Sequence, residues 1–253
     1  MSRQRITEAF ARAGAEGRGA FVAYLTVGHP TLEGSMAAVD DVIASGADIV
    51  ELGVPFSDPF ADGGTIRGAA YEALKQGVTL KSVLAFAGRV RARHPDTGLV
   101  VFSYYNPIVS MGLETFAEVA GNAGIDAVLV VDLPLEERGE LLGHLARRGM
   151  GFIPLVAPNT PLARVSASEE GLANSFLYIV TVKGITGARS ELPGDLSSRL
   201  DAIRSVSHLP IAAGFGISTK RQAAEVCRHA DGFVAGSALV KCVAEGRKPC
   251  LAP

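Results

Sequence analysis

Residues 47–54, Ala-Asp-Ile-Val-Glu-Leu-Gly-Val, place Glu51 in the middle of an apolar strand pattern. Because side chains alternate across a strand, Val50 and Leu52 share one face and Glu51 lies on the other. If the Val/Leu face packs under helices, Glu51 points into the interior of the fold. Loss of hydration there favours the neutral carboxyl group and raises its pKa. Glu51 is therefore a candidate general acid–base, and a buried glutamate used for packing is the alternative.

A second group of acids follows in residues 55–65, Pro-Phe-Ser-Asp-Pro-Phe-Ala-Asp-Gly-Gly-Thr. Asp58 precedes a proline and Asp62 precedes a glycine, which is typical of turns. The alternative is that one of these acids reaches over the site beside Glu51. Two carboxyl groups in one site can divide the work, because different environments keep one ionised and the other protonated. Spacing alone leaves both interpretations open.

Glycine-rich segments near the end of the chain are candidates for binding phosphate. They read Gly-Phe-Gly-Ile-Ser at 214–218 and Gly-Ser-Ala-Leu-Val at 236–240. Glycine lets backbone N–H groups approach an anion, and a helix N-terminus favours negative charge. Glycines that merely permit tight turns are the alternative. A third polar, glycine-rich segment at 183–189 is long enough to form a mobile lid.

Other catalytic chemistries have little support in the residues. Lys183 lies at or beyond the end of a strand pattern, beside Gly184, which favours a solvated lysine over a Schiff-base lysine in a desolvated interior. The five histidines are scattered without metal-ligand spacing. His29 is the histidine at the end of a strand, and we interpret it as a turn residue. The sequence has no nucleophile-elbow motif.

The elements that must position these residues are short apolar runs separated by amphipathic stretches. Most runs are nearly continuous in apolar character, as expected of strands covered on both sides. Helical patterns between them end at glycines such as Gly46, Gly124 and Gly149, and residues 66–94 accommodate two helices divided near Gly77. The predicted strands are 20–27, 47–54, 99–105, 127–133, 151–157, 175–182, 210–214 and 232–236.

This alternation predicts parallel β-α units, which either close into an eight-stranded barrel or form an open doubly wound sheet. Eight units in 253 residues favour the barrel. The Gly-x-Gly-x-x-Gly fingerprint of a dinucleotide-binding sheet is missing after the first strand, where Val-Gly-His-Pro stands at 27–30. We therefore predict one (β/α)8 barrel domain over residues 1–253. In such barrels catalytic groups lie at the carboxyl ends of strands, and phosphate binds at the loops after strands seven and eight.

Composition limits the class of protein. Lys and Arg number 24 against 26 Asp and Glu, a formal net charge of −2, so a general attraction to nucleic acid or anionic membranes is not expected. Hydrophobic residues make up 48% of the chain, which excludes disorder. The three cysteines, crowded near the end of the sequence, do not form a disulfide framework. With no signal peptide and no long apolar run, we expect a cytoplasmic protein.

The segment Leu-Gly-Val-Pro-Phe-Ser-Asp-Pro at 52–59, continuing to Ala-Asp-Gly at 61–63, resembles the signature of the tryptophan synthase alpha subunit family. The resemblance covers nearly the whole chain and implies a (β/α)8 TIM barrel with an extra N-terminal helix. It also implies retro-aldol cleavage of indole-3-glycerol phosphate to indole and glyceraldehyde 3-phosphate in tryptophan biosynthesis. Further matching segments, in the family's order, are 19–22, Tyr104 with Asn106, 128–134, 184–187, 214–218 and 236–238.

The resemblance implies roles for individual residues. Glu51 matches the family's catalytic glutamate, the proton shuttle, and Asp62 matches the aspartate that holds the indole N–H. Tyr178 matches a tyrosine that orders the glutamate, and Thr186 matches a lid threonine that closes toward Asp62. The implied substrate-binding residues are Phe21, Tyr104, Tyr178, Thr186 and Phe215. The implied phosphate-binding residues are Gly187, Gly216, Gly236 and Ser237.

The resemblance further implies a partner, a beta subunit that carries pyridoxal phosphate and receives indole through a tunnel in an alpha2beta2 heterotetramer. This chain itself would need no metal and no organic cofactor. The loop after strand two and residues 106–107 resemble the family's contact surface. The alternatives are a stand-alone lyase that releases free indole, a weakly active barrel that mainly activates a beta subunit, and a Schiff-base aldolase using Lys183.

Three departures from the family pattern bear on these expectations. Gly64 stands where the family usually has proline, so its loop should be looser when empty. Lys183 stands one position later than the basic residue of some members. The sequence ends at Pro253, soon after Gly236 and Ser237. A shortened C-terminal helix is therefore expected, with apolar surface between the first and seventh barrel helices.

Overall fold

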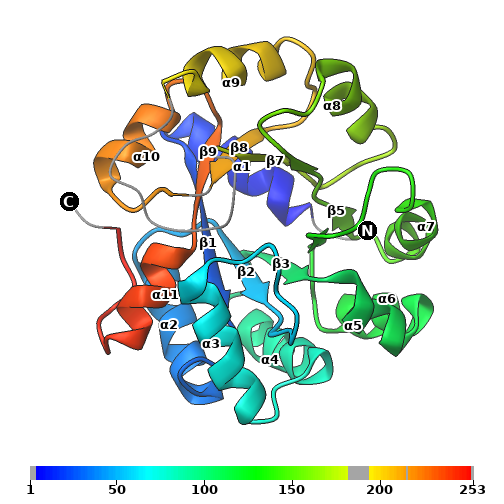
Figure 1. Cartoon of the computed structure of the whole chain (residues 1–253), viewed down its shortest axis with the longest axis vertical. Helices are drawn as coiled ribbons and strands as arrows, with labels where there is room; N and C mark the ends of the chain where they lie inside the picture. Colours follow the sequence, from blue (N-terminus) through cyan, green and yellow to red (C-terminus); the bar gives the residue numbers. More distant parts are fainter. Residues whose placement is uncertain (1–3, 182–193, 215, 252–253) are drawn as a thin grey trace.

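The computed structural model describes residues 4–181, 194–214 and 216–251. Its nine described strands pair in parallel, in the order β5-β4-β3-β2-β1-β9-β8-β7-β6. Figure 1 shows the strands at the centre with helices around them. The strands are β1 (Ala20–Thr26), β2 (Ile49–Gly53), β3 (Gly98–Ser103), β4 (Ala127–Val130), β5 (Gly151–Phe152), β6 (Leu155–Val156), β7 (Leu177–Val180), β8 (Ile211–Gly214) and β9 (Gly232–Ala235).

The two ends of this sheet meet in one short segment, residues 151–156, which holds both β5 and β6. Ile153 donates its N–H to the Val128 carbonyl of β4 at 2.9 Å, and the Tyr178 N–H of β7 donates to the Pro154 carbonyl at 3.1 Å. The segment therefore bonds to β4 on one side and β7 on the other, which closes the barrel. Pro154 has no N–H to donate, so the predicted fifth strand is divided into two short ones.

Helices cover the outside of the barrel. Thr31, Thr79 and Thr219 begin three of them, each accepting a hydrogen bond from the backbone N–H three residues later. The predicted division of residues 66–94 near Gly77 is confirmed. No described helix is long and apolar enough to cross a membrane. The helices are α1 (Arg5–Ala15), α2 (Leu32–Ala44), α3 (Gly64–Lys75), α4 (Leu80–Arg93), α5 (Tyr105–Met111), α6 (Leu113–Asn122), α7 (Gly139–Arg147), α8 (Leu162–Ser168), α9 (Leu196–Arg204), α10 (Lys220–Val226) and α11 (Ser237–Ala244).

Buried side chains form two clusters, one on each side of the barrel wall. In β1, Phe21 and Leu25 belong to the outer cluster, under the helices. Val22 and Tyr24 belong to the inner cluster, within the barrel. This separation follows from the alternation of side chains along a strand, so each strand residue faces either the helices or the interior.

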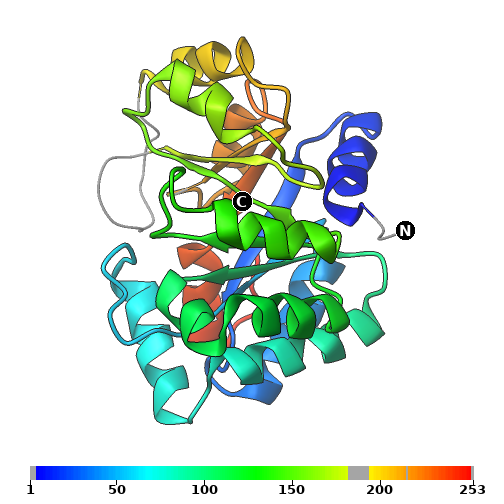
Figure 2. The ribbon, with the colours of Figure 1, turned by 90° about the vertical axis from the view of Figure 1, so that its right-hand side faces the viewer.

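Helix α1 closes the amino end of the barrel and confirms the extra N-terminal helix. Ile6, Ala9 and Phe10 are buried and join the inner cluster, and the Phe10 ring lies 5.3 Å from that of Phe176. Figure 2 shows α1, in blue, at the end of the barrel opposite the loop that follows β2. The helix therefore excludes water from this end of the interior.

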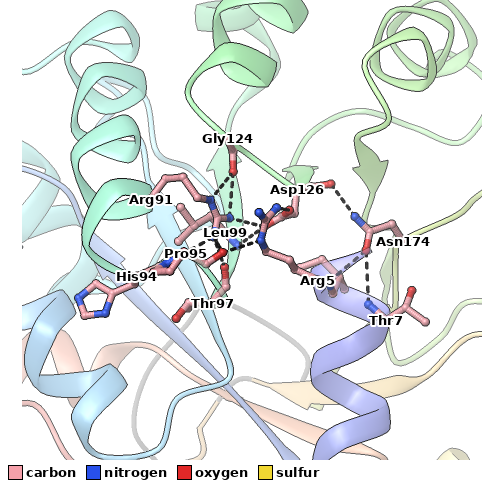
Figure 3. Close-up of polar contacts among 11 residues, drawn as sticks. Arg5, Thr7, Arg91, His94, Pro95, Thr97, Leu99, Gly124, Asp126 and Asn174 are labelled. Carbon is pink, nitrogen blue, oxygen red and sulfur yellow. Dashed lines mark hydrogen bonds and ion pairs between the residues drawn. The ribbon is translucent and has the colours of Figure 1, made fainter. Parts of the chain in front are cut away.

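A buried ionic cluster around Asp126 attaches α1 to the barrel (Figure 3). The Asp126 carboxylate pairs with Arg5 of α1 at 3.0 Å and with Arg91 of α4 at 2.6 Å. It also accepts the Leu99 N–H at 2.9 Å. The Asn174 amide links the same region to α1, donating to the Asp126 carbonyl at 3.2 Å and accepting the Ile6 N–H at 3.0 Å. Burial raises the pKa of Asp126, and Arg91 and Arg5 oppose that rise.

Helix α11 is the last helix among the described residues. This helix has 8 residues, and the described residues that follow it, up to Leu251, form no further helix. This agrees with the shortened C-terminal helix expected from the sequence. A groove of about 1240 Å³ lies on the outside of the barrel, lined by residues of α1 and α10, the residues directly after α2, and Leu251. The stacked rings of Phe21 and Phe233, 4.9 Å apart, line it. This is the apolar surface expected between the first and seventh barrel helices.

We expect Asp126→Asn to lower the free energy of unfolding by roughly 3 kcal/mol, because a neutral amide leaves two partly buried guanidinium groups without their carboxylate. Urea unfolding followed by circular dichroism measures the loss. Glu136→Gln, which removes an exposed ion pair with Arg164, is the matched control and should change stability little. Equal losses in the two variants would contradict the importance assigned to the Asp126 cluster.

Candidate active site

Glu51 points into the barrel from the centre of β2. It pairs with Tyr24 of β1 in the parallel register, while Val50 and Leu52 lie in the outer cluster. The Glu51 side chain is 0% exposed, and neither carboxyl oxygen has a hydrogen-bond partner among the described residues. Burial raises the pKa of Glu51 from 4.5 to about 8, because desolvation penalises the charged form. Glu51 is therefore mainly protonated at neutral pH.

Asp62 lies in the loop between β2 and α3 and is 6% exposed. The Tyr104 hydroxyl donates to its Oδ2 at 3.1 Å. Burial raises the pKa of Asp62 to about 6, and the hydrogen bond from Tyr104 and the charge of Arg67 limit the rise. Asp62 is therefore largely ionised at neutral pH, in contrast to Glu51.

Tyr104, which follows β3, fixes the loop that carries Asp62. Its hydroxyl accepts the Ala61 N–H at 3.1 Å while donating to Asp62. The Phe56 ring stacks on the Tyr104 ring at 4.9 Å, and the Phe60 ring meets its edge at 5.4 Å. The Tyr104 hydroxyl thus holds the loop with two hydrogen bonds, one donated and one accepted. The two aromatic rings that contact the Tyr104 ring fix its position.

A cavity of about 30 Å³ lies at the carboxyl ends of the strands. It has room for about one water molecule, so a larger substrate must displace surrounding groups. Gly236 and Ser237 border it at the start of α11, where the helix N-terminus favours an anion. The lining residues are Tyr24, Asp62, Ile66, Phe102, Tyr178, Gly216, Ile217, Val234, Gly236, Ser237 and Ala238.

Tyr24 and Tyr178 line the cavity and also interact electrostatically with Glu51. Burial raises the pKa of both Tyr24 and Tyr178 far above the ordinary value, and the charges of Glu51 and Asp62 add to each rise. Both phenols are therefore within electrostatic range of both acids. The two carboxyl groups predicted from the sequence therefore act on the same two phenols, although they come from a strand and from the loop after it.

The structure answers the question that the acidic loop left open. Asp58 is exposed and accepts a hydrogen bond from Ser57 at 2.6 Å, as a turn residue would, whereas Asp62 faces the cavity. The site also includes these predicted residues: Tyr104, Tyr178, Gly216, Gly236 and Ser237. Four other residues considered from the sequence, Lys183, Thr186, Gly187 and Phe215, lie outside the described residues.

The structure corrects the expectation for Phe21, which does not line this cavity. Its ring stacks on Phe233 and lines the outer groove. The reason is strand alternation: Phe21 belongs to the outward set of β1, and an aromatic side chain there packs among helices.

Tyr24 and Phe102 line this cavity but were not predicted as site residues from the sequence. Tyr24 lies three positions after Phe21, on the inward face of β1, and lines the cavity. The signal was present in the sequence, because the alternation rule that turns Glu51 inward also applies to β1. Phe102 of β3 was missed for the same reason, and its ring meets Tyr24 edge-on at 5.0 Å.

Metal-ligand geometry is not found among the described residues, where no group of three or more His, Cys, Asp or Glu side chains is placed to hold an ion. His29 lies in the turn after β1, where the Gly28 N–H donates to the Ser35 hydroxyl at 2.8 Å. Burial lowers the pKa of His29. Its position agrees with the interpretation as a turn residue.

The family profile described as tryptophan synthase alpha chain matches residues 10–250. The tryptophan synthase alpha chain of Citrifermentans bemidjiense is 45% identical over 237 residues, which cover 94% of this chain and 88% of that relative. The corresponding chain of Zymomonas mobilis is 40% identical over 239 residues, covering 94% and 87%.

Solved structures show the same similarity in three dimensions. A chain from Aquifex aeolicus matches with a TM-score of 0.88 and 37% identity, over 95% of this chain and 92% of that one. A chain of Mycobacterium tuberculosis tryptophan synthase matches with a TM-score of 0.88 and 33% identity, over 95% and 91%. These matches confirm the barrel fold.

The raised pKa of Glu51 predicts a pH-dependent cost to folding. Below pH 4.5 the group is protonated in both states; above it, the unfolded chain loses the proton while the folded protein keeps it until about pH 8. Stability should therefore fall by up to about 1.4 kcal/mol per pH unit in this window. We expect Glu51→Gln to be more stable than wild type at pH 7 and equally stable near pH 4.5. Urea unfolding at both pH values measures the difference, and a difference that does not vary with pH would contradict it.

Proposed function

The chain belongs to the tryptophan synthase alpha chain family, and on that basis we propose that it cleaves indole-3-glycerol phosphate to indole and glyceraldehyde 3-phosphate. The observation that carries the proposal is the pair of buried acids in one site, Glu51 with a pKa of about 8 and Asp62 with a pKa of about 6. Such a separation gives one proton donor and one carboxylate at neutral pH.

In the proposed mechanism, Glu51 begins protonated and transfers its proton to C3 of the indole ring. Asp62 accepts a hydrogen bond from the indole N–H and stabilises the positive charge that develops there. The Glu51 carboxylate then removes the proton of the glycerol hydroxyl. As the aldehyde forms, the C–C bond breaks and its electron pair restores the indole ring.

This cycle returns both acids to their starting states. Glu51 loses one proton and regains one, and Asp62 remains a carboxylate throughout. No electrons leave the substrate, so the balance of the reaction requires neither oxidant nor reductant. The raised pKa of Glu51 suits this exchange, because proton transfer in both directions is easiest when the pKa lies near the working pH.

The phosphate of the substrate is proposed to bind at Gly236, Ser237 and Gly216. All three border the cavity that Asp62 and Tyr178 also line. Gly236 directly precedes α11 and Ser237 is its first residue, which supports an anion held by backbone N–H groups at a helix N-terminus. With the phosphate there, the indole end extends toward the acids.

We also propose a tryptophan synthase beta subunit as the partner, with pyridoxal phosphate confined to that subunit. The Phe60 side chain, in the loop that carries Asp62, is 70% exposed, and Val109 of α5 is 49% exposed. Exposed apolar side chains beside an active site favour contact with another protein. Phe60 falls in the loop after strand two, which resembles the family's contact surface, and Val109 lies two residues after the other such segment, residues 106–107.

Replacing Glu51 by Gln should lower indole formation roughly a thousandfold, because an amide keeps the size of the side chain but transfers no proton. Indole release from indole-3-glycerol phosphate, measured at saturating substrate, tests this. Glu114→Gln on the exposed face of α6 is the matched control and should retain wild-type turnover. Substantial activity in Glu51→Gln would refute the assigned role.

Adding a beta subunit should raise the turnover of this chain by about tenfold or more, as expected of energetic coupling between the two subunits. Titration of the beta subunit into the indole-forming assay measures the activation. Val109→Asp should require more beta subunit for half-maximal activation, with basal turnover unchanged. If turnover does not change when the beta subunit is added, the chain is instead a stand-alone lyase.

A further inference from the structure

Two buried tyrosines each lie over a glycine of the neighbouring strand. The hydroxyl of Tyr24 on β1 occupies the space above Gly53. A Cβ atom added to Gly53 would lie only 2.3 Å from the Tyr24 hydroxyl oxygen, which is too close. Tyr178 on β7 has the same relation to Gly214, at 2.6 Å. Any larger residue at either glycine would displace a phenol. The glycines therefore define where the two hydroxyl groups lie.

The interior around Glu51 is otherwise apolar. The inner cluster that surrounds its level of the barrel is built of aliphatic and aromatic side chains, such as Val22, Val100 and Leu129. Among the described residues, the other ionisable groups that act on this space are Tyr24 from β1, Tyr178 from β7, Asp62 from the loop after β2 and Tyr104 after β3. When Glu51 gives up its proton, its carboxylate needs a donor, and the phenol of Tyr24, on the residue paired with Glu51, can be that donor.

Tyr24 is suited to donate to the Glu51 carboxylate by its position on β1 and by its contact with the Thr26 hydroxyl. It pairs with Glu51 in the register of β1 and β2 and is buried, with 6% of its surface exposed. Its hydroxyl contacts the Thr26 hydroxyl at 3.4 Å, where either oxygen can donate. A hydroxyl can accept one bond and donate another, so Tyr24 can accept from Thr26 and turn its own proton toward Glu51.

We propose that Tyr24 is a positioning residue that donates a hydrogen bond to the Glu51 carboxylate after the proton has passed to the substrate. This inference rests on the proposed function for its catalytic meaning. A hydrogen bond to the charged form favours that form, so it limits the cost of ionising Glu51 in a dry interior. The phenol proton stays on Tyr24, whose own pKa is far above the working range.

Tyr24→Phe is the direct test, because it removes the hydroxyl and keeps the ring that packs against Phe102. We expect kcat at pH 7 to fall about tenfold, the effect of one lost hydrogen bond to a charged group, with KM nearly unchanged. Because Glu51 must start protonated, the alkaline limb of the kcat profile should move upward by about one pH unit. A merely structural role would lower activity without moving this limb.

A second readout does not depend on turnover. Infrared difference spectra during a pH titration follow the protonated carboxyl band that Glu51→Gln removes. In Tyr24→Phe the midpoint of this band should rise by about one unit relative to wild type, and in Tyr71→Phe, which alters an exposed tyrosine of α3, it should not change. An unchanged midpoint in Tyr24→Phe overturns the inference.

The two readouts separate this inference from the proposed function. If wild type forms indole but Tyr24→Phe shifts neither profile nor midpoint, the inference is wrong and the proposed function stands. If wild type does not cleave indole-3-glycerol phosphate, the proposed function is wrong, and the infrared midpoints alone decide whether Tyr24 donates to Glu51.

Discussion

The burial of one carboxyl group inside an apolar barrel is the constraint that organises this protein. Glu51 has no exposed surface and no hydrogen-bond partner among the described residues, which is costly for a group that ionises easily in water. Glu51 avoids the cost of a buried charge because its raised pKa keeps it protonated at neutral pH. A buried acid of this kind destabilises the fold at neutral pH and is retained because it is useful, which is how strained groups in active sites generally persist.

The rest of the fold keeps that interior dry and closed. Helix α1 covers one end through Ile6, Ala9 and Phe10, and its position depends on the ion pairs between Arg5, Asp126 and Arg91. At the other end, the two acids have different pKa values because their environments differ. Asp62 stays lower in pKa than Glu51 because the Tyr104 hydroxyl and Arg67 favour its charged form.

Much of this arrangement could be predicted from the sequence, where local patterns decide the outcome. Continuous apolar runs identified the strands, and Glu51 was found because it lies in the middle of such a run. Predictions failed where a residue's direction had to be known. Phe21 was assigned to the site by resemblance although its outward face on β1 places it under the helices, and Tyr24 was overlooked on the inward face. The division at Pro154 and the exposure of Asp58 depend on three-dimensional contacts that spacing does not contain.

The most direct test of the central claim is the titration of Glu51 itself in the folded protein, followed by the carbon NMR shift of its labelled carboxyl group and assigned with Glu51→Gln. A midpoint far above 4.5 is expected, because complete burial raises the pKa toward about 8 and the hydrogen bond proposed from Tyr24 offsets only part of that rise. A midpoint near the ordinary value of 4.5 would mean that the carboxylate is solvated or paired. Glu51 would then begin the reaction ionised, and it could not be the initial proton donor.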